Sequence, residues 1–342
     1  MTGALAVVGG RLATELVDVT DDLAALESSG FWAVVLPFEG QPICARFAEV
    51  RPARPWPGPA WRGPRVDEWT SSLSEEEFKA GVRAIRASIE AGDVYQVNLT
   101  RRLSALMPEG GDIAALGAAL AEGNPAPYSA VVRLPSVDCH VASASPERFL
   151  WRDGDLVSSS PIKGTAPDPA GLTAKDAAEN VMIVDLVRND LGRVCEFGSV
   201  SVPGLLALEH HPGLVHLVST VSGRLRPGCG WPEAIAATFP PGSVTGAPKV
   251  SALEQIAALE PVGRGVYCGA VGWVDADATT ADLAVGIRTF WFTAGAGDDR
   301  GLILRLGVGA GITWASDPAL EWQETELKAA TLLSVASGST PG

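Results

Sequence analysis

The chain has 342 residues, of which 46% are hydrophobic, so it can bury a sizeable core in one or two domains. Its net charge of −14 argues against general binding to nucleic acid phosphates or to an anionic membrane surface. Its five scattered cysteines lack C-x-x-C spacing, which excludes the usual disulfide framework or zinc pattern. Without a basic amino-terminal signal or a long apolar stretch, the sequence predicts a cytoplasmic protein.

The first 69 residues predict short strands followed by a connector. Three short apolar runs before residue 50 are separated by Gly, Pro and acidic residues, which is typical of strands. Residues 51–69 are rich in Pro, Arg and Trp, and proline removes backbone donors and disfavours helix. We therefore expect residues 1–69 to be a β-rich segment and surface connector that packs on a catalytic domain of residues 70–338.

A helix and a strand open the expected catalytic domain. The S-x-x-E pattern of a capping box starts an amphipathic helix at Ser74, which should end near Gly92. Alternation over residues 94–103 then predicts a strand with Gln96 and Asn98 on one polar face. Such a face either meets water, which is the more common case, or lines a polar pocket.

Lys163 stands out in the segment SPIKGT, between predicted strand and helix. Most lysines are solvated surface charges, so its neighbours must support any functional interpretation. If burial lowered its pKa, the neutral amine would be a nucleophile. Glu147, at the end of a preceding strand, is a candidate general acid for a leaving hydroxyl.

Two acidic pairs occur on two predicted helices. Asp176 and Glu179 share a face of the helix expected over 175–191, and Glu321 and Glu324 share a face of the last helix. Each pair alone would mark a solvated helix face. If the helices bring the pairs together, their oxygen-only ligands suit Mg²⁺, which would hold a substrate carboxylate.

Three further features suggest anion binding between these helices. The Gly/Pro-rich loop 239–249 opens a helix whose free N–H groups attract anions. Arg288 falls inside an otherwise uncharged predicted strand, where a cation usually needs a carboxylate partner. The small residues 309–311 let a ligand approach the backbone.

The histidines between residues 210 and 216 are only a weak candidate for a metal site, because a proline interrupts the run.

Nine ordered blocks between residues 70 and 335 resemble the chorismate-utilising enzymes, a family that includes anthranilate, aminodeoxychorismate, isochorismate and salicylate synthases. The resemblance implies an α+β fold with large mixed β-sheets packed as a sandwich and flanked by helices, and the irregular alternation of elements also favours α+β. The blocks are GDVYQVNLTRRL (92–103), SASPERFL (143–150), SPIKGT (160–165), AENVMIVDLVRNDLG (178–192), HLVST (216–220), FPPGSVTGAPKVSALE (239–254), residues 267–274, AVGIRT (284–289) and EWQETELK (321–328).

Two positions distinguish the reactions within this family. Members that add water at C2 of chorismate carry a lysine where this chain has Gln96, and anthranilate synthases typically carry alanine where it has Lys163. The resemblance therefore implies that Lys163 adds at C2 while the C4 hydroxyl leaves, and that ammonia then displaces the lysine at C4. The product would be 4-amino-4-deoxychorismate, a precursor of 4-aminobenzoate and folate. The alternatives are anthranilate synthesis and a non-catalytic regulatory subunit.

The resemblance also implies roles for individual residues. Glu179 and Glu324 match direct Mg²⁺ ligands, while Asp176 and Glu321 match acidic residues that reach the ion through water. Glu147 and His216 match residues beside the reacting ring. The expected substrate-binding residues are Gln96, Gly164, Thr165, Thr245, Tyr267, Arg288, Gly309, Ala310, Gly311 and Lys328.

The sequence contains no glutaminase motif, since no cysteine lies in a G-x-C-x-G turn followed by His and Glu. We therefore expect a separate glutamine amidotransferase subunit to deliver ammonia, unless free ammonium serves. The amino-terminal segment also lacks the Leu-Leu-Glu-Ser motif of family members that bind tryptophan, so feedback by that amino acid is not expected.

Overall fold

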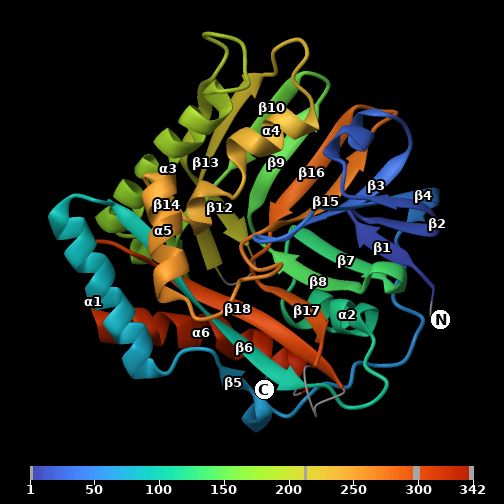
Figure 1. The fold of residues 1–342 in the computed structure, drawn as a ribbon, viewed down its shortest axis with the longest axis horizontal. Helices are drawn as coiled ribbons and strands as arrows, with labels where there is room; N and C mark the ends of the chain where they lie inside the picture. Colours follow the sequence, from blue (N-terminus) through green and yellow to red (C-terminus); the bar gives the residue numbers. More distant parts are fainter. Residues whose placement is uncertain (1–2, 212–213, 296–300, 339–342) are drawn as a thin grey trace.

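The computed structural model describes residues 3–211, 214–295 and 301–338 (Figure 1). Its strands form one hydrogen-bonded network with helices packed against it, which confirms the α+β class. Each pairing between described strands is antiparallel, so the expectation of mixed sheets needs correction. Hairpins and longer returns, rather than βαβ units, connect the strands, and such connections give antiparallel pairs.

The elements have the following bounds in chain order. The strands are β1 (Leu5–Val8), β2 (Arg11–Thr20), β3 (Phe31–Leu36), β4 (Ile43–Pro52), β5 (Thr70–Ser71), β6 (Gln96–Leu106), β7 (Tyr128–Leu134), β8 (Cys139–Ser145), β9 (Arg148–Asp153), β10 (Leu156–Ser160), β11 (Ile162–Ala166), β12 (Ser201–His211), β13 (Leu214–Arg224), β14 (Gly246–Ala247), β15 (Ala270–Asp275), β16 (Thr280–Val285), β17 (Thr289–Ala294) and β18 (Leu302–Ile312). The helices are α1 (Glu75–Ala91), α2 (Ile113–Gly123), α3 (Ala174–Gly192), α4 (Trp231–Thr238), α5 (Lys249–Leu259) and α6 (Pro318–Ala336).

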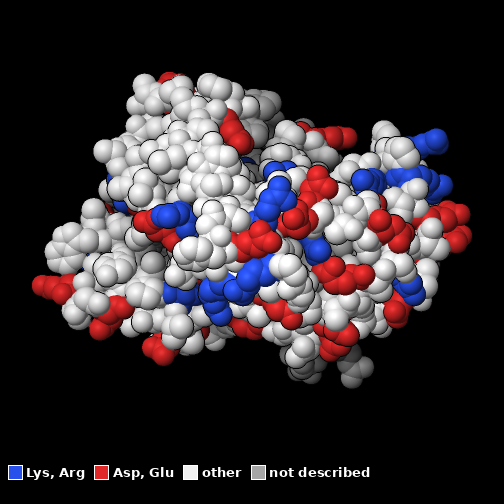
Figure 2. Space-filling view, turned by 90° about the horizontal axis from the view of Figure 1, so that it is seen from above, with Lys and Arg blue, Asp and Glu red and all other residues white. Residues whose placement is uncertain are grey.

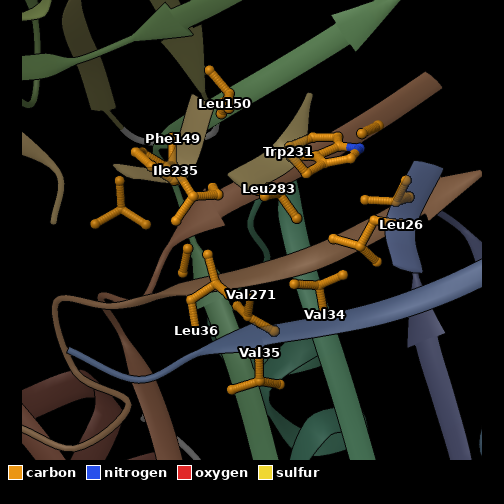
Figure 3. Close-up of a cluster of buried hydrophobic side chains, with 14 of the residues drawn as sticks. Leu26, Val34, Val35, Leu36, Phe149, Leu150, Trp231, Ile235, Val271 and Leu283 are labelled. Carbon is orange, nitrogen blue, oxygen red and sulfur yellow. The ribbon is translucent and has the colours of Figure 1, made fainter. Parts of the chain in front are cut away.

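The largest hydrophobic core lies between layers of this network. Side chains of β3 and β15 meet those of β7, β8, β9 and α4 in one buried cluster. Figure 3 shows part of it, with Val34 and Val271 near Trp231 and Leu283. The continuous apolar run of β3 is explained by burial of both of its faces. Each fully buried large aliphatic side chain contributes about 1.5–3 kcal/mol.

The amino-terminal strands are part of the sheet. β3 pairs with β15, bringing Val34 opposite Gly272, and β1 pairs with β7, bringing Ala6 opposite Val132. Side chains from these strands contribute to the same core cluster as those of the later strands. The first 50 residues therefore help to hold the framework on which the later segments are arranged.

The helix expected after Ser74 is confirmed as α1. The Ser74 hydroxyl accepts a hydrogen bond from the Glu77 N–H, and the Glu77 carboxylate accepts one from the Ser74 N–H. Gly92 ends the helix with a left-handed φ of 86°. The apolar face of α1 packs against β6 and α6, where the rings of Phe78 and Trp322 lie 5.7 Å apart.

The strand expected to contain Arg288 is interrupted. β16 ends at Val285 and β17 starts at Thr289, and Arg288 between them has a left-handed φ of 50°. The Gly286 N–H donates to the Gly269 carbonyl at 2.7 Å, so the chain turns there instead of continuing the pairing. The expectation of a cation inside a regular strand was wrong, and Arg288 lies in a turn.

Acidic and basic side chains are interspersed over the face seen from above in Figure 2. All five cysteines carry free thiols, four of them buried. Among the described helices, none is both long and apolar enough to cross a membrane.

Candidate active site

A cavity of about 690 Å³ lies between β11, β13, β18 and the helices α3 and α6. This volume suits a small-molecule ligand. Most of the residues selected from the sequence line it, although they come from segments far apart in the chain. They are Glu147, Lys163, Gly164, Thr165, Asp176, Glu179, His216, Tyr267, Arg288, Gly309, Gly311, Glu321, Glu324 and Lys328.

Lys163 extends into this cavity from β11. Its Nζ donates a hydrogen bond to the Ser243 carbonyl at 3.0 Å. Burial lowers the pKa of Lys163, whereas the nearby carboxylates of Glu179 and Glu147 act in the opposite direction. The amine is therefore held against the loop before α5, and burial shifts it toward its neutral form.

Glu147 lies beside Lys163 between β8 and β9, and only 5% of its surface is exposed. Burial raises its pKa to about 7, while hydrogen bonding to Ser243 and the charge of Lys163 act against this rise. A carboxyl group that keeps its proton near neutral pH can act as a general acid.

The two acidic pairs meet across the cavity, with lysines between them. Lys175 Nζ lies 3.7 Å from a carboxylate oxygen of Glu179 on α3 and 3.7 Å from one of Glu321 on α6. Lys328 Nζ lies 2.6 Å from a carboxylate oxygen of Glu324. Burial raises the pKa of Glu179 and of Glu321, and the neighbouring Glu324 carboxylate adds to both rises, while Lys175 opposes them.

The fit of these groups to Mg²⁺ rests on their chemistry. Three of the carboxylates, from Glu179, Glu321 and Glu324, provide only oxygen donors and have lysines as their present counter-charges. Asp176 instead accepts hydrogen bonds from the N–H and hydroxyl of Thr173, at 2.8 and 2.7 Å. Among the described residues, no three acidic, His or Cys side chains are grouped closely enough to hold a metal ion. The donor type fits Mg²⁺, but to share one ion the carboxylates would have to move closer together and Lys175 would have to leave them.

Glycines form the parts of the wall where side chains approach the backbone. A Cβ on Gly311 would lie 2.3 Å from Gln96 Nε2 and 3.6 Å from Lys163 Nζ. Gly164 has a left-handed φ of 89°, and a Cβ there would lie 2.8 Å from the Cβ of Asp176. These glycines allow β11, β18 and the start of α3 to approach one another around the cavity.

Gln96 is almost fully buried, with 1% of its surface exposed. Its Oε1 has no hydrogen-bond partner among the described residues, which is costly for a buried acceptor. Asn98, on the same strand face, lines the cavity. Exposure to water is therefore wrong for this face, and the pocket is confirmed for Asn98, whereas Gln96 is buried beside Gly311 without lining the cavity.

Three selected residues, Gln96, Thr245 and Ala310, are not among those that line the cavity. The Thr245 hydroxyl is buried and donates to the Pro241 carbonyl at 3.1 Å, so it shapes the loop. Ala310 is in a hydrophobic core because side chains alternate along β18, leaving Gly309 and Gly311 at the cavity. Only the backbone of Ala310 can contribute to ligand binding.

His216 and Arg288 differ in their partners. His216 is buried, and its Nδ1 lies 2.8 Å from the Thr165 hydroxyl. The Arg288 guanidinium lines the cavity and has no hydrogen bond or ion pair with another described side chain or carbonyl, and burial lowers its pKa. It is therefore available to a ligand carboxylate.

Sequence reasoning missed residues that support the site. Arg264 pairs with Glu260 at 2.6 Å and donates to the carbonyls of Val244 and Asn98 at 2.8 and 2.7 Å. This contact attaches the loop before α5 to β6. The i,i+4 spacing of Glu260 and Arg264 could have indicated the pair, but nothing local in the sequence indicates its burial or its two carbonyl partners. Lys175 has the same i,i+4 spacing to Glu179.

The chain is similar in sequence and in fold to several known proteins. A family model described as chorismate binding enzyme matches residues 44–334. Aminodeoxychorismate synthase component 1 of Klebsiella aerogenes is 43% identical over 270 residues, 75% of this chain and 57% of that protein. Anthranilate synthase component 1 of Streptomyces coelicolor is 41% identical over 277 residues, 78% of this chain and 52% of that protein.

The chain thus spans little more than half the length of these two relatives. Among solved structures, a putative 2,3-dihydroxybenzoate-specific isochorismate synthase from Bacillus anthracis superposes with a TM-score of 0.78. That match covers 97% of this chain and 96% of the other at 24% identity, and it shows a common fold.

Proposed function

The chain belongs to the chorismate binding enzyme family, and we propose that it aminates chorismate at C4 to form 4-amino-4-deoxychorismate. The observation that carries the proposal is Lys163, whose amine lies in the main cavity beside the buried acid Glu147. A nucleophile and an acid in one cavity can substitute a hydroxyl group in two steps.

In the first step the neutral Lys163 amine bonds to C2 of chorismate, the ring double bonds shift, and the C4–O bond breaks. Glu147 gives its proton to the departing hydroxyl, which leaves as water. In the second step ammonia bonds to C4, the double bonds shift back, and the C2–N bond breaks to return the Lys163 amine. The new ammonium group gives a proton to Glu147, so chorismate and ammonia become the product and water.

Cations in the cavity would hold the two carboxylates of the substrate. The unpaired Arg288 guanidinium and the N–H groups near Gly309 and Gly311 suit one carboxylate. Bound Mg²⁺ would supply positive charge for the other, with Glu179 and Glu324 as direct ligands and Glu321 and Asp176 acting through water. Lys175 would then no longer be the counter-charge of Glu179 and Glu321.

The test is to incubate the purified chain with chorismate, Mg²⁺ and an ammonium salt and to separate the products by chromatography. We expect 4-amino-4-deoxychorismate from the natural chain and its loss in Lys163→Ala. A Lys163→Arg variant is the matched control, because it keeps the positive charge without a readily formed neutral amine. Anthranilate as the product, or full turnover by Lys163→Ala, would contradict the proposal.

Anthranilate synthesis remains the second candidate, because the Streptomyces coelicolor relative is 41% identical. The same product analysis separates the two reactions. A non-catalytic regulatory subunit would bind chorismate without converting it, or would not bind it at all, which calorimetry with Mg²⁺ and chorismate would detect. For ammonia supply, we propose a separate glutamine amidotransferase subunit, in keeping with the name component 1 of the relatives.

A further inference from the structure

A second, much smaller cavity lies behind Glu147, and we call it the rear chamber. Its volume is about 20 Å³, and Glu147 and Ser243 line both it and the main cavity. A cavity needs roughly 10–15 Å³ of this volume to hold one water molecule. The rear chamber is therefore a site for one molecule of water size, separated from the main cavity by the proposed acid.

The surroundings of the rear chamber favour a small uncharged molecule. Phe149, Val187 and Val285 contribute apolar walls, and Phe149 is visible at the edge of the core in Figure 3. Asp190 and Arg148 also line it, but both charges are paired: Lys249 Nζ lies 2.6 Å from the Asp190 carboxylate, and the Arg148 guanidinium lies 2.9 Å from the Asp282 carboxylate. The chamber is too small for a hydrated cation, while the Glu147 carboxyl group can bond to a polar guest.

We propose that the rear chamber binds ammonia and delivers it past Glu147 to C4 of the substrate. The inference rests on the proposed function, in which Glu147 protonates the departing C4 hydroxyl. The position that this water vacates is then next to Glu147, and the chamber lies on the other side of the same side chain. Ammonia is as small as water, so it can move from the chamber to that position without passing the bound substrate.

Filling the chamber tests the proposal. Val187→Ile adds one methyl group to a side chain of the chamber wall, in a space that holds one molecule of water size. We expect the KM for ammonium to rise about tenfold, equivalent to roughly 1.4 kcal/mol, while the KM for chorismate stays the same. Val184→Ile is the matched control, because Val184 is buried on the same helix but does not line the chamber.

Enlarging the chamber gives an independent test with a different readout. Val187→Ala makes room for methylamine, which is one methyl group larger than ammonia. We expect mass spectrometry to find the N-methylated product from Val187→Ala, but not from the natural chain or the control Val184→Ala. Calorimetric titration with chorismate checks that every variant folds and keeps the main cavity.

The outcomes separate this inference from the proposed function. An unchanged KM for ammonium in folded Val187→Ile, or no methylated product from folded Val187→Ala, would show that the rear chamber does not deliver ammonia. Either result would leave the proposed function standing. Anthranilate as the natural product would overturn both the proposed function and the delivery of ammonia to C4, because ammonia would then bond to C2. If the natural chain aminated nothing, both would fall.

Discussion

At the scale of single residues, the site depends on two groups with opposite protonation requirements. Lys163 must be neutral to act as a nucleophile, whereas Glu147 must be protonated to act as an acid. Burial moves both pKa values in the required directions, lowering that of Lys163 and raising that of Glu147 to about 7. The pair works when it holds one proton and that proton is on the carboxyl group.

This requirement predicts a bell-shaped dependence of kcat/KM on pH. At low pH the pair holds two protons and the lysine cannot attack, and at high pH it holds none and the acid cannot donate. In Glu147→Gln only the neutral lysine is needed, so the decline at high pH should disappear. We also expect the rate to fall by about 10²–10⁴-fold in this variant.

Steady-state rates over a pH series check this prediction, with Glu254→Gln as the control because Glu254 is an exposed carboxylate on α5. A high-pH decline that persists in Glu147→Gln would assign that decline to another group.

Gln96 has a buried side-chain oxygen without a hydrogen-bond partner among the described residues, and it lies close to Lys163. Its buried Oε1 lacks a partner, so Gln96→Met should raise the free energy of unfolding by about 1–3 kcal/mol. If this oxygen accepts a hydrogen bond during the reaction, the same change should lower kcat/KM. Denaturant unfolding and product formation measure the two effects.

Asn180 provides the matched control, since it is equally buried but donates to the Leu217 carbonyl at 3.0 Å and accepts a bond from Ser219. Asn180→Leu should therefore destabilise the protein. A Gln96→Met variant that loses stability would show that the oxygen has a partner in solution.

At the scale of elements, the sequence predicted those features that depend on residues close together in the chain, such as helix caps. The capping box predicted before α1 acts within one turn and is present. The polar face of β6 was ambiguous, because burial of Gln96 and Asn98 depends on β14 and β18, which are far away in the chain. Arg288 was misassigned because the turn depends on the backbone contact between Gly286 and Gly269.

The buried pair of Glu260 and Arg264 joins elements, and its loss should be severe. Arg264→Met removes bonds to the carbonyls of Val244 and Asn98 and leaves the buried Glu260 carboxylate without its counter-charge. We expect a loss of about 3–5 kcal/mol in the free energy of unfolding. The double variant Glu260→Met/Arg264→Met also removes the buried Glu260 charge. It should therefore recover part of the lost free energy of unfolding.

Urea unfolding of the single and double variants gives the comparison, with Arg65→Met as the control for an exposed ion pair. A double variant no more stable than Arg264→Met would assign the loss to the carbonyl contacts.

At the scale of the whole molecule, the candidate site depends on the meeting of distant segments. The carboxylates of α3 and α6 were identified in the sequence as separate pairs, and their meeting on one ion was a hypothesis that no local pattern could test. In the structure, the shared contact of Lys175 with Glu179 and Glu321 links the two helices. The amino-terminal strands hold β15 and β7 in the same network, which no local pattern in their sequence could predict.

This arrangement predicts that Mg²⁺ stabilises the folded chain by replacing a lysine bridge. An ion bound only by the folded state raises the free energy of unfolding by about 2.7 kcal/mol at a concentration of 100 times its Kd. Glu179→Gln and Glu324→Gln should abolish this increase. Lys175→Gln should strengthen Mg²⁺ binding by up to about 1 kcal/mol, because it removes a competing cation from two carboxylates.

Denaturant unfolding at several Mg²⁺ concentrations measures these changes without any need for turnover. Glu254→Gln serves as the control for loss of a carboxylate elsewhere on the surface. Because Lys175 bridges α3 and α6 in this structure, Lys175→Gln alone should be less stable than the natural chain without Mg²⁺ and should gain more from its addition. Equal Mg²⁺ stabilisation of all variants would place the ion outside these carboxylates and leave lysine as their permanent partner.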